Sequence, residues 1–496
     1  MRALINDPEK RKWFTLGAVS FGLFMIMLDN TVVNVALPAI ARDLHIGLSE
    51  LEWVVTGYAL TFAALMLSGG KLADHYGRRR LFVLGILVFT AASLACGLAT
   101  GGSTLIAARI VQGVGAALMN PATLSIIAAT FAPRQRGMAI GIWAGVSALA
   151  LAIGPLVGGL ITEHASWNWI FFINVPVGIA AIAASYLFID ESKDKRADQR
   201  LDLPGLFTSG VGLFALEYAL IEANTYGWTS GRIVACFAVA AVALVSFVWI
   251  EVTGRAPMLD VSLFRNTTYV GANIVMLLVA LAMFGVFFFV SLYMQNVLGY
   301  SAVQAGAAFL PMTILIVLVA PVTGKLSDKY GSRWFITAGL TLLAVQLLYF
   351  SQLGSSATYW ELLPAFLIGG VGMGLTMTPA SAAAMRAVPV DRAGVGSAVL
   401  NSARQVGGSL GIAIMGAIVA ASVTVSLQGA YASRNPALIH TAINQFVNGF
   451  SNALMVAAAI AFAGAVVAAL LIRHEVHEEA PPTVEETVER IVEPVA

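Results

Sequence analysis

The strongest constraint in this sequence is a succession of apolar runs, each long enough to cross a lipid bilayer. A membrane-spanning helix needs about 20 consecutive apolar residues, and the 496-residue chain contains fourteen runs of roughly this size. Only 11% of the residues are charged, whereas soluble domains carry roughly 25%. The sequence therefore predicts an all-α membrane protein whose spans lie near residues 14–38, 51–70, 81–100, 104–130, 137–161, 169–189, 205–223, 232–251, 270–294, 303–323, 334–353, 360–384, 394–421 and 449–472.

The distribution of lysine and arginine predicts how these helices are oriented, because cytoplasmic loops carry an excess of both residues. With the N-terminus inside, 23 of the 28 basic residues fall in inside segments and three fall outside. The remaining two, Arg109 and Arg404, lie within helices. We therefore expect both termini in the cytoplasm and the chain in the cell (inner) membrane. The longest outside loop is expected at residues 422–448.

An internal repeat predicts that the chain has two related halves. The segment Gly70–Arg80 (GKLADHYGRRR) follows the second span, and a near copy, Gly324–Arg333 (GKLSDKYGSR), follows the tenth. Parallel repeats of this kind build two halves around a central site in one major class of transporter. The expected division is a cytoplasmic N-terminus (1–13), a six-helix bundle (14–189), a linker with two inserted helices (190–268), a second six-helix bundle (269–472) and an acidic disordered tail (473–496).

Several function classes are disfavoured by the sequence. A net charge of +1 provides no basic stripe for nucleic acid. Cys96 and Cys236 lie in apolar runs without metal-ligand spacing. There is no GxxxxGK[ST] or HExxH motif, which argues against ATP-driven pumping and against an enzyme. We expect no cofactor; the expected partners are a small-molecule substrate, protons and the bilayer, and the need for an adaptor protein stays open.

Placing a charged side chain in mid-membrane costs free energy, so a residue that does so is a candidate for function. Asp29 lies about 14 Å from the outer end of the first helix, and Arg109 about 8 Å into the fourth. Gln112, one turn deeper than Arg109, is level with Asp29. Burial favours the protonated form of an acid and a nearby cation favours the ionised form. Asp29 and Arg109 could thus form a proton switch, and the alternative is a fixed structural ion pair.

Two further intramembrane charges allow two interpretations each. Arg404 could face a central cavity or extend towards the inner surface. Glu217, in the first inserted helix, could make a structural polar contact or bind a proton. Other polar and aromatic residues are candidates for a substrate pocket, although aromatic residues at membrane edges also serve as interfacial anchors. These candidates are Asn34, Tyr58, Gln112, Trp143, Tyr293, Gln295 and Asn296.

Several segments resemble those of a known family. The repeated GKLxDxYGxR segment resembles the signature between helices 2 and 3 of the major facilitator superfamily. Four other segments resemble motifs of its fourteen-helix drug:proton antiporter branch or of the superfamily, with Ala150 and Asn168 as departures from the pattern. They are Leu28–Pro38 in helix 1, Arg109–Gly115 in helix 4, Gly145 with Gly154–Gly159 in helix 5, and Trp167–Pro176 at the helix 5–6 junction.

The resemblance implies two six-helix bundles with two inserted helices, and export of small molecules in exchange for protons by alternating access. An acid in an apolar pocket wall would favour amphipathic, often cationic cargo. The alternatives are an exporter of an endogenous metabolite, antibiotic or lipid, a proton-coupled importer, and a non-transporting sensor. The resemblance also implies gating or sealing roles for Gly70, Asp74, Gly77, Arg78, Asp328 and Arg333 at the inner ends, and for Gly145, Gly154, Pro155, Gly158 and Gly159 in helix 5, where ordinary helix packing is the alternative.

Overall fold

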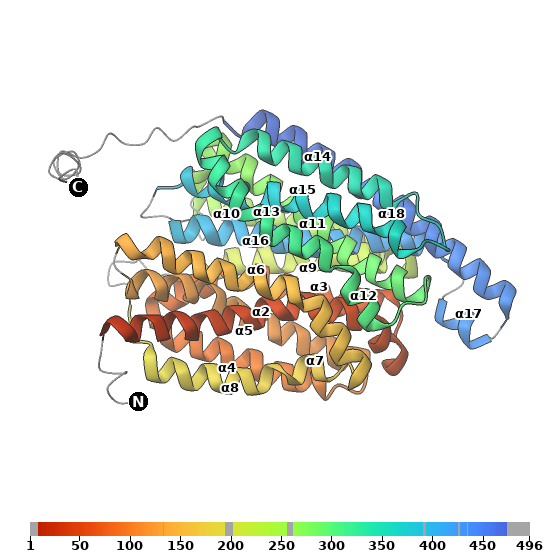
Figure 1. The fold of residues 1–496 in the computed structure, drawn as a ribbon, viewed down its shortest axis with the longest axis horizontal. Coiled ribbons are helices and arrows are strands. Elements are labelled where there is room, and N and C mark those ends of the chain that lie inside the picture. The colour runs from red at the N-terminus through yellow and green to blue at the C-terminus, as the bar shows by residue number, and fades with distance from the viewer. Residues whose placement is uncertain are drawn as a thin grey trace, which may run out of the picture.

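The computed structural model describes residues 8–131, 133–193, 202–254, 261–389, 393–424, 427–433 and 435–473. The expected tail beyond Arg473, most of the central linker and the first seven residues lie outside this range. All regular structure in the described ranges is helical, and the long helices run side by side in an elongated body (Figure 1). The predicted all-α architecture is confirmed.

The helices fall into two halves and an inserted pair. The first half contains α2 (Pro8–Leu44), α3 (Leu48–Tyr76), α4 (Arg78–Gly97), α5 (Gly102–Thr130), α6 (Pro133–His164), α7 (Trp169–Phe172) and α8 (Asn174–Phe188). The inserted pair is α9 (Leu203–Tyr226) and α10 (Gly231–Thr253). The second half contains η1 (Val261–Arg265), α11 (Thr267–Asn296), α12 (Ala302–Ala308), α13 (Leu310–Tyr330), α14 (Arg333–Phe350), α15 (Tyr359–Arg386), α16 (Ala393–Ser422), α17 (Leu427–Ser433) and α18 (Pro436–Leu471).

These helices match the expected membrane spans. Within the described residues, thirteen helical segments are long and apolar enough to cross a bilayer. The α7–α8 pair and the α12–α13 pair each form one such segment. The fifth expected span corresponds to α6, which is 32 residues long and packs along α2. The fold therefore accommodates the fourteen predicted spans.

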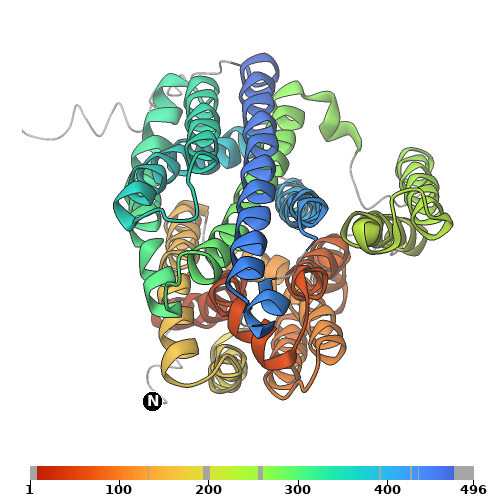
Figure 2. The same ribbon diagram turned by 90° about the vertical axis from the view of Figure 1, so that its right-hand side faces the viewer.

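The packing within the two halves is the same. In the first half α2 packs on α6, α3 on α5, and α4 on both α5 and α8. In the second half α11 packs on α16, α13 on α15, and α14 on both α15 and α18. Figure 1 shows the first half below the second, and Figure 2 shows the α9–α10 pair at the side of both. The repeat seen in the sequence is therefore a repeat of two six-helix bundles.

Three predictions about helix ends were wrong. The first helix extends from Pro8 to Leu44 rather than over 14–38, and Pro38 lies inside it. Residues 422–448 are not a loop, because α17 and the outer part of α18 occupy most of them. The repeated GKLxDxYGxR segments are also largely helical: α3 continues to Tyr76, and Gly77, with φ +118°, turns the chain directly into α4. Glycine adopts this positive φ without the steric cost that other residues bear.

The two halves are joined at their outer ends, opposite the side on which Pro8 lies. The Ser291 hydroxyl of α11 donates to the carbonyl of Asn34 on α2 at 2.9 Å. The backbone N–H of Val303 on α12 donates to the Glu163 carboxylate of α6, also at 2.9 Å. We call these contacts of α2 with α11 and of α6 with α12 the outer interface. They close the outer side of the molecule.

Candidate functional site

An ion pair between Asp29 and Arg109 lies inside the first half. Asp29 is in the middle of α2 and Arg109 in the outer part of α5, and these two helices pack together. Arg109 Nη1 donates to Asp29 Oδ2 at 2.5 Å, and each side chain is only 1% exposed. The structure thus brings together the two intramembrane charges that the sequence singled out.

Gln112 completes the polar contacts of Asp29. Its amide Nε2 donates to Asp29 Oδ1 at 3.0 Å and to the Ser93 hydroxyl of α4 at 2.7 Å. Its amide oxygen accepts from Arg109 Nη1 at 2.6 Å. Both oxygens of the carboxylate therefore accept a hydrogen bond, one of them from a cation, and such charge-assisted bonds are the strong ones in a protein interior.

Ser93 and Asn174 belong to this site but were missed from the sequence. The Asn174 amide of α8 donates to the Ser93 hydroxyl at 3.3 Å, and both residues are buried. The only available signal was a small polar residue in an otherwise apolar span. That signal recurs along the chain, so only the tertiary packing of α4, α5 and α8 identifies these two.

The Arg109 guanidinium is held by the helices around it. Its Nε donates to the carbonyl of Val54 on α3 at 2.9 Å. The guanidinium carbon lies 4.3 Å from the centre of the Tyr58 ring and 5.7 Å from that of Phe171. Stacking of an arginine on aromatic faces in a site without water contributes about 2 kcal/mol or more. Tyr58, predicted for the substrate pocket, is therefore a packing partner of the arginine.

Some predicted pocket residues lie at the outer interface. The Asn34 side chain donates to the Asn30 carbonyl at 3.1 Å, while its own carbonyl accepts from the second half. Gln295 Nε2 donates to the Val35 carbonyl at 2.9 Å. Asn296 is half-buried beside Gln295 at the end of α11. Asn34 and Gln295 thus make contacts between the two halves.

Other predicted pocket residues lie elsewhere. Trp143 Nε1 donates to the Thr123 hydroxyl at 3.0 Å, between α6 and α5 of the first half. The Tyr293 hydroxyl donates to the Gly354 carbonyl, and its ring stacks on Phe450 inside the second half. The structure therefore does not gather the predicted pocket residues around one space.

Arg404 is the intramembrane charge of the second half. It lies half-buried on α16, and its Nε is buried without a hydrogen-bond partner among the described residues. The Nε2 of the neighbouring Gln405 is in the same situation. Arg404 thus contrasts with Arg109, whose guanidinium is fully engaged.

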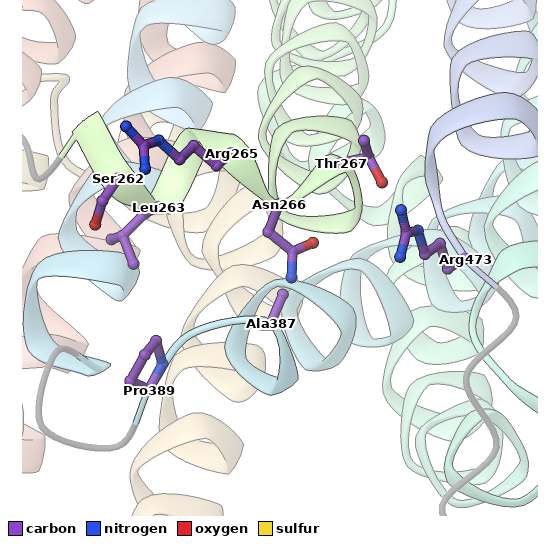
Figure 3. A pocket seen from close by; sticks show the side chains of 8 residues that line it. All are labelled: Ser262, Leu263, Arg265, Asn266, Thr267, Ala387, Pro389 and Arg473. Carbon is purple, nitrogen blue, oxygen red and sulfur yellow. The ribbon is translucent and has the colours of Figure 1, made fainter.

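Asp29 lines neither of two cavities found among the described residues. One, of about 390 Å³, lies at the inner end of the second half and presents two arginines, Arg265 and Arg473 (Figure 3). The other, of about 370 Å³, lies between α9, α16 and α18. None of the predicted site residues lines either cavity. The ion pair is therefore enclosed by protein in this arrangement.

Helix α6 packs closely against both halves through its glycines. A Cβ atom at Gly154 or Gly158 would collide with Thr31 or Val32 of α2, and one at Gly159 would collide with the Ala302 backbone of α12. A Cβ atom at Gly306 of α12 would likewise collide with the carbonyl oxygen of Pro155 on the same stretch of α6. Because α2 and α12 belong to different halves, this part of α6 forms part of the outer interface.

Gly145 behaves differently from the other glycines of α6. A Cβ atom at this position would meet nothing within 4 Å, and the residue is exposed. Its predicted part in close helix packing is therefore absent from this arrangement of the helices.

The repeated segments at the inner ends make different contacts in the two halves. Asp74 and Arg78 pair at 2.9 Å across the turn at Gly77, and the backbone N–H of Arg78 donates to the Ser192 carbonyl at 3.0 Å. Gly70, one turn before Asp74, packs against Pro121 of α5.

In the second copy, Asp328 pairs instead with Arg386 of α15 at 2.5 Å. Arg333 stacks on Trp334, with 4.9 Å between its guanidinium carbon and the ring centre. The two copies share a backbone shape, but they do not share an ion pair.

Comparison with known proteins places the chain in a family. A family model described as the Major Facilitator Superfamily matches residues 19–412. The tetracenomycin C resistance and export protein of Streptomyces glaucescens is 35% identical, with 83% of this chain and 77% of that protein covered. The multidrug resistance protein Stp of Mycobacterium tuberculosis is 38% identical, with 85% and 78% covered. The puromycin resistance protein pur8 of Streptomyces alboniger is 37% identical, with 84% and 83% covered.

A solved structure shares the fold. It is a bacterial homolog to the human lysosomal transporter Spinster, and it aligns with a TM-score of 0.64 at 18% identity, over 92% of this chain and 97% of that one. The family match covers the first half, the inserted pair and the second half as far as Ile412 in α16. This chain belongs to the major facilitator superfamily and is a multi-pass membrane transporter rather than an enzyme.

Proposed function

We propose that this chain is a proton-coupled antiporter of the cell membrane that exports amphipathic, often cationic small molecules by alternating access. The observation that carries the proposal is the Asp29–Arg109 pair, buried in mid-membrane. Ionisable groups are expensive there and mark proton or substrate pathways. The names of the relatives, which refer to resistance and export, support drug-like cargo. In this proposal residues 14–189 and 269–472 form the two bundles, and residues 190–268 form the inserted unit.

The contacts of Asp29 suggest how coupling works. Arg109 and Gln112 each donate to one carboxylate oxygen and stabilise the ionised form, so binding of a proton or a cationic substrate is disfavoured while these partners stay in place. Once Arg109 withdraws, a proton and a cation compete for the same carboxylate. Proton binding from the outside would release substrate there, and proton loss on the inside would admit the next one. Alternating access to one acid thus gives exchange.

A second candidate cargo is an antibiotic made by the producing cell itself. The S. glaucescens relative is named for both resistance to and export of tetracenomycin C. An antibiotic and a synthetic cationic dye would both need an apolar pocket with a few polar groups. A substrate screen that includes both classes separates the two candidates.

The test uses purified protein in proteoliposomes that contain a pH-sensitive dye. Adding a transported cation should move protons in the wild type, and Asp29→Asn should abolish this movement. Asp43→Asn is the matched control, because Asp43 lies on the same helix and accepts from Trp167 Nε1 at the outer end, away from Arg109 and Gln112. Its proton movement should equal that of the wild type. Unchanged coupling in Asp29→Asn would remove this carboxylate from the mechanism.

A further inference from the structure

Two buried acids lie outside the Asp29 site, where α9 meets both halves. Glu217 of α9 is 0% exposed and Glu52 of α3 is 2% exposed. One oxygen of Glu217 accepts from the Ser409 hydroxyl of α16, and the other, Oε2, is buried without a hydrogen-bond partner. The Glu52 carboxylate lies against Gly416 of α16, where a Cβ atom would collide with it. Both acids thus lie against α16.

Among the described residues no ion pair involves either acid, and the charged groups that act on Glu52 are the carboxylates of Glu222 and Glu217. Glu222, five residues after Glu217 on α9, accepts from the Ser49 hydroxyl at 2.7 Å and lies within electrostatic range of Glu52. The cation on α10, Arg232, stacks on two tyrosines of α9 instead. The remaining titratable or charged groups of α9, α10 and α16 are Tyr218, Tyr226, Cys236, Glu251 and Arg404.

This environment favours the neutral form of both acids. A buried carboxylate without a cation or enough hydrogen-bond donors is costly, and two neighbouring anions also repel each other. A protonated acid avoids both costs, because it needs only one donor and one acceptor. In the closed arrangement, therefore, this pair retains protons that it would release into water.

The position of the pair connects it to opening of the molecule. Helix α3 belongs to the first half and α16 to the second, and they pack on each other and on α9. The Ser402 hydroxyl of α16 donates to the Ala63 carbonyl of α3 at 3.4 Å, and the Asn224 amide of α9 donates to the Ala417 carbonyl of α16 at 2.6 Å. If the outer ends of α3 and α16 separate, water reaches both acids.

We propose that Glu52 and Glu217 form a second proton-binding site at the α3–α9–α16 junction, loaded when the outer side closes and emptied when it opens. The inference rests on the proposed alternating access, and it gives the inserted helix α9 a part in controlling when the outer side closes. Because the closed arrangement binds more protons, a lower pH favours closure of the outer side. The site takes up protons from the outer side as it closes and returns them there as it opens, so it sets the pH dependence of closure.

The test measures the outer opening directly as a function of pH. Spin labels at His45→Cys and Ser355→Cys, both exposed outer positions on different halves, report the distance between the halves in a chain whose own cysteines are replaced. In the wild type, the short-distance population should grow as the pH falls. In Glu52→Gln/Glu217→Gln, which mimics the protonated pair, the short distance should dominate at every pH. A pH response equal to that of the wild type would overturn the proposal.

Two further variants separate this site from its neighbours. Glu222→Gln should keep the pH response, because this half-buried acid already has the Ser49 donor; a loss equal to that of the double variant would overturn the assignment. In Asp29→Asn the pH response of the distance should persist although coupled proton movement is lost. If Asp29→Asn abolishes the response, the outer opening is controlled by Asp29 and the second site is refuted.

A count of protons moved per substrate completes the test. Because this site takes up and releases its protons on the same side of the membrane, Glu217→Gln should move as many protons per substrate as the wild type, and a lower count would contradict the proposal. Exchange of labelled substrate across the membrane without a pH gradient reports transport itself. Its absence in the wild type would refute the proposed function rather than the second proton site.

Discussion

At the scale of single residues, Gln112 and Gln346 are two buried glutamines in opposite situations. Gln112 connects Asp29, Arg109 and Ser93 through hydrogen bonds. Gln346 of α14 donates only to the Met312 sulfur at 3.8 Å, and its amide oxygen has no partner among the described residues. The glutamine amide thus has hydrogen-bond partners for both its nitrogen and its oxygen at position 112, but not at position 346.

We predict opposite effects when each glutamine is replaced by methionine. Gln112→Met leaves a buried carboxylate oxygen without a donor and should destabilise the protein by about 1–3 kcal/mol. Gln346→Met removes an unsatisfied amide at little change in volume and should be neutral or stabilising by up to about 1 kcal/mol. Thermal unfolding in detergent measures both. A higher melting temperature for Gln112→Met than for Gln346→Met would contradict this account.

The sequence identified the central residues because depth can be counted along a helix. Asp29, Arg109 and Gln112 come level at 1.5 Å per residue whether or not their helices touch. Partner choice is different, because it depends on which helices pack together. Asp328 pairs with Arg386 rather than within its own repeat, and Ser93 joins the site only because α4 packs on α5. Neither contact has a spacing that a sequence displays.

At the scale of helices, α6 offers a matched pair of glycines. A Cβ atom at Gly158 would lie 2.7 Å from the Val32 carbonyl oxygen, whereas at Gly145 nothing lies within 4 Å. Gly158→Ala should push α6 away from α2, lower stability by about 1–3 kcal/mol and reduce transport at least tenfold. Gly145→Ala should leave both unchanged or raise stability slightly, as alanine favours a helix. Transport and melting assays on both variants check this, and equal loss in the two would contradict it.

The existence of the helices could be predicted from apolar runs, but their ends could not. An apolar run marks the part of a helix that lies inside the bilayer. The helix itself can continue beyond the bilayer into water. Helix α18 begins at Pro436, where the Asn435 side chain accepts from the Ala437 N–H, thirteen residues before the predicted apolar run. Such a cap is visible in the sequence as Asn-Pro, a helix-start signal that the apolar pattern alone ignores.

At the scale of the whole molecule, the outer interface should open in every transport cycle. Glu163 of α6 and Val303 of α12 meet across it at 2.9 Å. Cross-linking Glu163→Cys to Val303→Cys with a short thiol-specific reagent should therefore block transport, and a cleavable reagent should allow recovery. Cross-linking Asp328→Cys to Arg386→Cys, both in the second half, should leave transport active. Full transport with the first pair linked would show that this interface need not separate.

The two halves and the inserted pair could be predicted from the repeat and the basic residues, because both patterns survive small errors in helix ends. The arrangement of the halves could not, since it depends on which of several conformations the packing favours. Contacts such as Ser291 with Asn34 join residues far apart in the chain and carry no mark in the sequence.

The length of α18 has a practical consequence. Its 36 residues correspond to about 54 Å, whereas the hydrocarbon core of a bilayer is about 30 Å thick. Its outer part, with α17 beside it, projects past the ends of the other helices (Figure 1). An antibody fragment raised against this projection would add a rigid, recognisable mass to a small particle, and electron cryomicroscopy could then orient images of a transporter that otherwise lies almost wholly within detergent.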